Sequence, residues 1–145
     1  MFGKLFRVGT FCALLQLTFV LAAHGETVVT WNSLKKLDDL AERSEGLCER
    51  KAVAELRKLA MPIKKAVAAV VAEPVPAGAK NPGQVKVLLG DLKSLSDSLT
   101  NPGQQDGGEL TAILCGIHPI VEKLLEAAGM PHVHEDEKPA KKAKP

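Results

Sequence analysis

The sequence predicts an all-α protein built as an up-down-up-down four-helix bundle. Three observations support this fold class: long segments poor in Gly and Pro, apolar residues that recur every three or four positions, and turn-forming clusters between those segments. The 145 residues are 46% hydrophobic and 25% charged, which is typical of a globular chain. A chain of this length forms one domain and excludes the large multidomain enzymes.

The first helical segment is expected over residues 33–73, with Asn32 or Ser33 as its cap. At 1.5 Å per residue, an unbroken helix of this length would extend about 60 Å and leave half of its apolar stripe uncovered. We therefore expect a break near residues 44–46, where Gly46 supplies the left-handed residue that ends a helix. The alternative is a three-helix protein with one long first helix.

Two further helices follow the cluster of Pro and Gly after residue 73. Asn81 caps the first of them, with Pro82 at the first helical position, and the second starts near Gly108 and stops at Gly129. The tetrapeptide Asn-Pro-Gly-Gln occurs twice, at 81–84 and 101–104, and we interpret it as a repeated turn signal.

Two prolines fall inside the predicted helices. Pro62 and Pro119 each remove a backbone donor and crowd the preceding turn. The expected consequence is a kink in the second and in the last helix.

The N-terminus has the pattern of a secretory signal peptide. Lys4 and Arg7 precede an apolar run over residues 8–23, and small residues end the segment. We place the signal at 1–25, the bundle domain at 26–131 and a polar, flexible tail at 132–145. Cleavage after Gly25 leaves no stable membrane span, whereas an uncleaved anchor is the alternative. The mature protein is expected to be periplasmic or fully secreted.

Signal removal changes the charge balance. Without Lys4 and Arg7, 17 basic residues remain against 17 acidic ones, and all four Phe lie in the signal region. Neutral charge and the lack of Phe and Tyr argue against nucleic-acid binding. The expected partners are metal ions or a protein of the cell envelope.

Cys48 and Cys115 remain after signal removal, and an even pair in an oxidising compartment favours a disulfide. The expected break at Gly46 places Cys48 in the second helix, diagonal to the last one. Neighbouring helix axes are already about 8 to 10 Å apart, whereas bonded cysteines need Cα atoms within about 7 Å. Two buried thiols and an intermolecular bond therefore stay open as alternatives.

The signal peptide, the helix lengths and the Leu and Ala spacing over residues 31–128 resemble the small periplasmic four-helix bundles of the soluble cytochrome b type. The resemblance implies the bundle architecture. In that class a Met near the start of the first helix and a His on the last helix hold haem, and His118 lies on the last helix here. Leu34 and Leu37 stand where the Met would be needed, so only the architecture is carried over.

The residues best suited to bind a metal follow the last helix. His132 and His134 are two apart, so an extended chain presents both imidazoles on one side, and Glu135, Asp136 and Glu137 come directly after them. Imidazole is a common ligand of Zn, Cu and Ni. His118 is a weaker candidate, because about 16 Å of helix separates it from Gly129.

The sequence therefore predicts an exported, non-enzymatic binding protein that captures divalent transition-metal ions through this tail. No phosphate-binding, dinucleotide-binding, zinc-protease or serine-hydrolase motif occurs in the chain. No cofactor is required, and the bound ion would be Cu, Zn or Ni. The alternative is a structural or interaction bundle of the cell envelope with no metal role.

Overall fold

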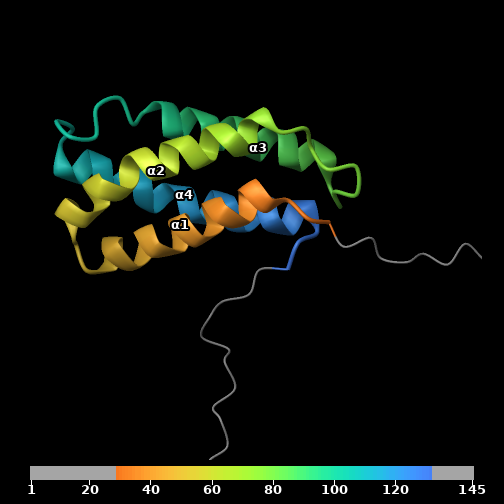
Figure 1. Cartoon of the computed structure of the whole chain (residues 1–145), viewed down its shortest axis with the longest axis horizontal. Coiled ribbons are helices and arrows are strands. Elements are labelled where there is room, and N and C mark those ends of the chain that lie inside the picture. The colour runs from red at the N-terminus through yellow and green to blue at the C-terminus, as the bar shows by residue number, and fades with distance from the viewer. Residues whose placement is uncertain (1–28, 132–145) are drawn as a thin grey trace, which may run out of the picture.

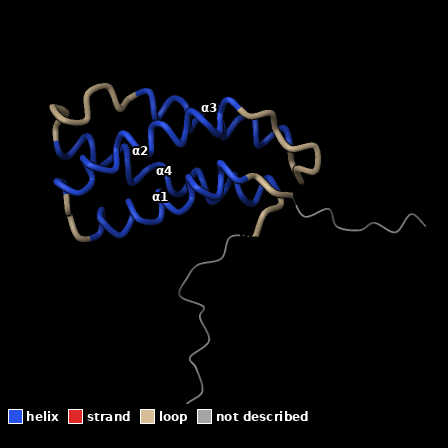
Figure 2. Tube along the Cα trace, in the orientation of Figure 1, coloured by secondary structure: helices blue, strands red, loops and turns tan. Residues whose placement is uncertain are grey.

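The computed structural model describes residues 29–131, which form four helices. They are α1 (Asn32–Glu49), α2 (Val53–Ala72), α3 (Pro82–Asp97) and α4 (Gly107–Ala128). The helices lie along one axis with short connections at the two ends of the bundle (Figures 1 and 2). α1 and α3 each pack on α2 and α4, and α2 also touches α4 across the bundle. The predicted four-helix architecture is confirmed, and the three-helix alternative is wrong.

The apolar stripes of all four helices meet in one core. Because residues three and four apart share a helix face, each helix contributes a continuous row of buried side chains. The fully buried large side chains are Leu34, Leu37, Leu56, Ile63, Val67, Val70, Leu92, Leu99, Leu110, Leu114, Ile117 and Leu124. Among the described residues, the buried polar ones are Ser44, Ser96 and His118. No described helix is both long enough and apolar enough to cross a bilayer.

The break between α1 and α2 lies later than predicted. Gly46 is inside α1, which continues to Glu49, and the chain turns at Arg50 and Lys51. Lys51 has a φ of 55°, so a lysine occupies the left-handed position that the prediction gave to Gly46. The amide of Ala52 donates to the carbonyl of Leu47 and closes the turn at 2.9 Å. Cys48 therefore belongs to α1.

Helix capping follows the prediction at α3 and departs from it at α1. Trp31 occupies the N-cap of α1 without a side-chain cap bond, so the expected caps Asn32 and Ser33 are wrong. Asn81 caps α3, accepting from the amide of Gln84 at 3.1 Å. Gly129 ends α4 with a φ of 77°, as its position after the last apolar residue predicts.

Asp106 caps α4, where its Oδ1 accepts the amides of Gly108 at 2.8 Å and Glu109 at 3.1 Å. These backbone hydrogen bonds, that from Glu109 most strongly, lower the pKa of Asp106 because they stabilise the charged carboxylate. The cap is therefore strongest when Asp106 is ionised.

Both internal prolines lie within helices. Pro62 is in α2 and Pro119 is in α4, and each helix continues past its proline. The predicted signal at 1–25 and the predicted tail at 132–145 lie outside the described residues. The described chain begins and ends at the same end of the bundle, beside the start of α1 and the end of α4 (Figure 1).

Candidate functional site

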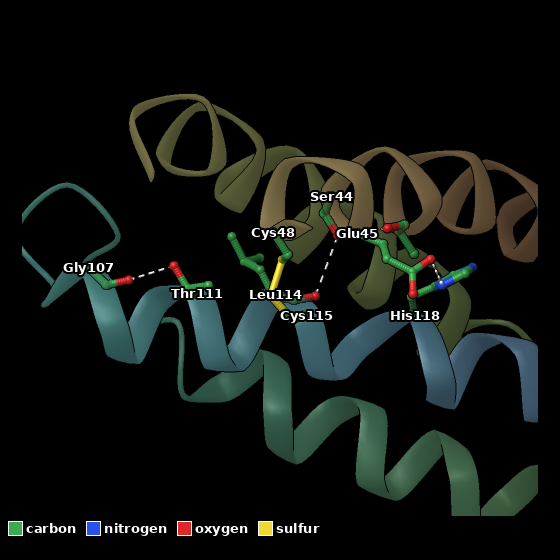
Figure 3. The surroundings of a disulfide bond; sticks show 9 residues. Ser44, Glu45, Cys48, Gly107, Thr111, Leu114, Cys115 and His118 are labelled. Atoms are coloured by element: carbon green, nitrogen blue, oxygen red, sulfur yellow. Dashed lines mark hydrogen bonds and ion pairs between the residues drawn. A yellow bond between two sulfur atoms is a disulfide. The ribbon is translucent and has the colours of Figure 1, made fainter. Parts of the chain in front are cut away.

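A disulfide joins the first helix to the last. Cys48 lies in the last turn of α1 and Cys115 in the middle of α4, with an S–S distance of 2.03 Å and Cα atoms 6.1 Å apart (Figure 3). The expected geometric difficulty disappears because Cys48 is on α1, which packs directly on α4. Cys48 was predicted to lie on the diagonal helix because the break between the first two helices was predicted too early in the chain.

His118 forms a second bridge between the same two helices. Its Nδ1 lies 2.7 Å from Oε2 of Glu45, and the two side chains point toward each other in Figure 3. The His118 side chain is 3% exposed, whereas that of Glu45 is 49% exposed. An imidazole inside the bundle thus donates to a carboxylate at its surface. The interaction is an ion pair when His118 is protonated and a hydrogen bond when it is neutral.

The two bridges are one helical turn apart. Glu45 precedes Cys48 by three residues and His118 follows Cys115 by three, so antiparallel helices joined at the cysteines bring the other two residues together. We call these four residues the α1–α4 clamp.

Ser44 lies beside the clamp. Its Oγ donates to the carbonyl of Ala41 at 2.8 Å and is 3.5 Å from the carbonyl of Leu114 (Figure 3). The hydroxyl is satisfied within its own helix although the residue is fully buried. With the disulfide and the Glu45–His118 bridge, this contact makes three neighbouring interactions between α1 and α4.

The clamp is suited to holding helices together. The disulfide removes both cysteines as thiolate ligands or nucleophiles, and Glu45 occupies one imidazole nitrogen of His118. Within residues 29–131, no group of three or more His, Cys, Asp or Glu side chains is arranged to hold a metal ion. Cys115 and His118 therefore join α4 to α1, through Cys48 and Glu45 respectively.

The predicted metal ligands His132, His134, Glu135, Asp136 and Glu137 lie outside the described residues. The last described residue before them is Pro131. Its neighbour Met130 donates its amide to the carbonyl of Leu125 at 2.9 Å, so the chain is held to α4 up to this point. The first predicted ligand, His132, thus lies two residues beyond a fixed position on the bundle.

A groove of about 890 Å³ lies at this end of the bundle, between α1 and the end of α4. Trp31, Leu125 and Met130 supply apolar lining. The charged lining residues come from the first three turns of α1: Lys35, Asp38, Asp39, Glu42 and Arg43. We call this feature the Trp31 groove. Val29 and Pro131, at the two ends of the described chain, also line it.

Comparison with protein-family models, curated proteins and solved structures gives no match for this chain.

Two features were not predicted from the sequence. The first is the partnership of Glu45 with His118, although the equal spacing of both residues from the cysteines was available as a signal once a disulfide was assumed. The second is the Trp31 groove. Trp31 is the single Trp of the chain and stands directly before the first apolar stripe, which indicates a packing position but does not predict a groove.

Proposed function

We propose that the protein is an exported, non-enzymatic binding protein that captures divalent transition-metal ions through His132, His134, Glu135, Asp136 and Glu137. The observation that supports this proposal is the composition of the segment after α4, where two imidazoles and three carboxylates occur within six residues. Neutral imidazole and carboxylate are ligands of Zn, Cu and Ni, so the segment contains more than the four donors that a closed zinc site needs.

The end of α4 supports the proposal because it gives these ligands a defined starting point. Gly129 caps the helix, and Met130 is bonded back to Leu125. Only Pro131 separates that fixed residue from His132. A site that begins so close to a rigid helix loses less conformational entropy on binding than one on a long linker.

Export is supported by the disulfide. Structural disulfides persist in oxidising compartments and are rare in the cytosol, and Cys48 is bonded to Cys115. The positive N-terminus and the apolar run before Gly25 favour the same route. We therefore propose a periplasmic or secreted location after signal cleavage.

Haem binding of the cytochrome b type is not part of the proposal. Leu34 and Leu37, at the start of α1, are fully buried core residues in the place where a Met ligand would be required. The likeness to that class is one of architecture.

Calorimetric titration of the protein from Glu26 to Pro145 with Cu, Zn and Ni tests the function. We expect saturable binding that disappears in the double variant His132→Ala/His134→Ala. Binding should weaken as the pH falls, because the imidazoles must lose their protons to coordinate a metal. A matched control, Lys141→Ala/Lys142→Ala, changes two residues of the same segment that are not proposed ligands and should bind like the unmodified protein.

Two results would contradict the proposal. One is an absence of binding in the unmodified protein, and the other is equal binding in the unmodified protein and the histidine variant. Either result leaves the alternative function, an interaction bundle of the cell envelope, whose partner can then be sought by affinity capture with the bundle domain.

A further inference from the structure

The Trp31 groove combines an apolar wall with a rim of both charges. Trp31 itself is only 2% exposed, while Lys35, Asp39 and Arg43 are exposed at the rim. A volume of about 890 Å³ lies within the range of about 300 to 1,000 Å³ of small-molecule sites. The groove is therefore large enough to hold a peptide segment or a small molecule.

Two cations on its rim lack acidic partners. Among residues 29–131, neither Lys35 nor Arg43 forms an ion pair. The indole Nε1 of Trp31 also has no hydrogen-bond acceptor among these residues, although it is buried. Water hydrates the two exposed cations, and a segment outside residues 29–131 can supply them with an anion and the indole with an acceptor.

From these observations we propose that the Trp31 groove binds the C-terminal segment of the same chain, residues 132–145. The place where the described chain ends favours this occupant. Pro131 lines the groove, so residue 132 begins at its edge and no intervening linker has to be ordered. An intramolecular segment tethered so closely has a high effective concentration.

The reach of the segment fits the length of the groove. Asn32 and Arg43, both in the lining, are separated by about 17 Å along α1. An extended chain advances about 3.3 Å per residue, so the six residues 132–137 cover about 20 Å. The carboxylates of Glu135, Asp136 and Glu137 then reach the level of Arg43.

The groove and the segment both carry charges of the two signs. In the proposed register the carboxylates at 135–137 would lie near Arg43, beside which Asp39 and Glu42 also line the groove. The lysines from Lys138 onward would continue toward Glu45 and Glu49, farther along α1. Opposite charges at this spacing favour one direction of docking. The contact does not depend on metal, so it goes beyond the proposed function.

A paramagnetic label tests the docking. Ala140→Cys carrying a nitroxide is prepared without reductant, so that the Cys48–Cys115 bond stays intact, and all spectra are recorded in EDTA. We expect the amide signals of residues 43–50 to lose most of their intensity, whereas signals from α3 around the exposed Val87 stay sharp. High salt should restore the lost signals, because the rim charges are screened.

Charge reversal identifies the contact. Lys35→Glu/Arg43→Glu should abolish the broadening, and adding Glu135→Lys/Asp136→Lys/Glu137→Lys should bring it back. The matched control reverses Lys58 and Lys65, two exposed lysines of α2, and should leave the broadening unchanged.

Uniform weak broadening over the whole bundle would overturn the proposal, as would broadening that survives the reversal of Lys35 and Arg43. A second occupant is tested with a nitroxide at residue 26: if that label broadens the groove lining while the label at residue 140 does not, the N-terminal segment occupies the groove and the proposal fails. The variant His132→Ala/His134→Ala in the same assay separates docking from metal capture. It should retain the broadening even though it cannot capture metal.

Discussion

The imidazole Nδ1 of His118 lies 2.7 Å from the carboxylate Oε2 of Glu45, across the contact between the last helix and the first. One helical turn away, Cys48 and Cys115 join the same helices covalently. A disulfide and a polar bridge thus stabilise one seam of the bundle at neighbouring positions.

The polar bridge can be measured by removing its exposed partner. We expect Glu45→Ala to lower the free energy of unfolding by about 1 kcal/mol, because the buried Nδ1–H of His118 loses its acceptor and water can replace it only in part. Glu45→Gln keeps an acceptor and should cost less. Urea unfolding at neutral pH provides the measurement, with Glu49→Ala on the same helix as a control that loses no stability. Equal stability of all three variants would show that the bridge contributes nothing.

The disulfide should make a larger contribution. The bond closes a loop with a sequence separation of 67 residues, for which the chain-entropy model gives about 4 kcal/mol. We expect Cys48→Ala/Cys115→Ala to fold into the same helices and to unfold at a much lower urea concentration. The unmodified protein from Glu26 to Pro145 should contain no titratable thiol. A full complement of free thiols would refute the bond.

Lys51 offers a stabilising substitution. A non-glycine residue with a φ of 55° costs about 1 to 2 kcal/mol, which exceeds the entropic cost of about 0.5 to 1 kcal/mol for introducing glycine. Lys51→Gly should therefore raise the free energy of unfolding by about 0.5 to 1 kcal/mol. The neighbouring Arg50 has a φ of −83°, so Arg50→Gly should instead lower it. If both glycines destabilise the protein, the left-handed turn at Lys51 is wrong.

The lowered pKa of Asp106 predicts that the stability of the protein depends on pH. Its pKa is lowered in the folded protein by the backbone N–H groups that it caps, so its contribution is complete above the pKa of the unfolded chain. The contribution is lost as the pH falls through the lower, folded pKa. Asp106→Asn keeps a capping oxygen without the charge, and we expect its melting temperature to fall less steeply from neutral pH to about pH 2. Asp91→Asn, exposed on α3, should follow the unmodified protein.

The spacing of apolar residues was sufficient to predict four helices, because a buried stripe can be read directly as a helix face. It also marked Gly129 as the end of α4, where a left-handed residue without a side chain is required. The break between α1 and α2 was predicted too early because Gly46 was also taken as a left-handed residue that ends a helix. Gly46 has no such requirement, since the buried stripe of α1 continues past it to Leu47.

A better signal for that break was the helix face on which successive buried residues would lie. Leu47 and Leu56 are both buried and nine residues apart. At about 100° per residue, one continuous helix would place them on opposite faces. The chain must turn between them, as it does at Arg50 and Lys51. The Trp31 groove had no comparable signal, since it depends on how the first turns of α1 and the end of α4 meet in space.

The bond between Cys48 and Cys115 also determines what a protease can do to this protein. It closes a covalent ring that contains α2, α3 and the first part of α4. A single cut inside the ring, for example after the exposed Lys80, opens the ring without releasing a fragment. The two parts of the nicked chain stay covalently joined until a reductant is added, so in an oxidising compartment one cleavage between the helices leaves the bundle as one molecule.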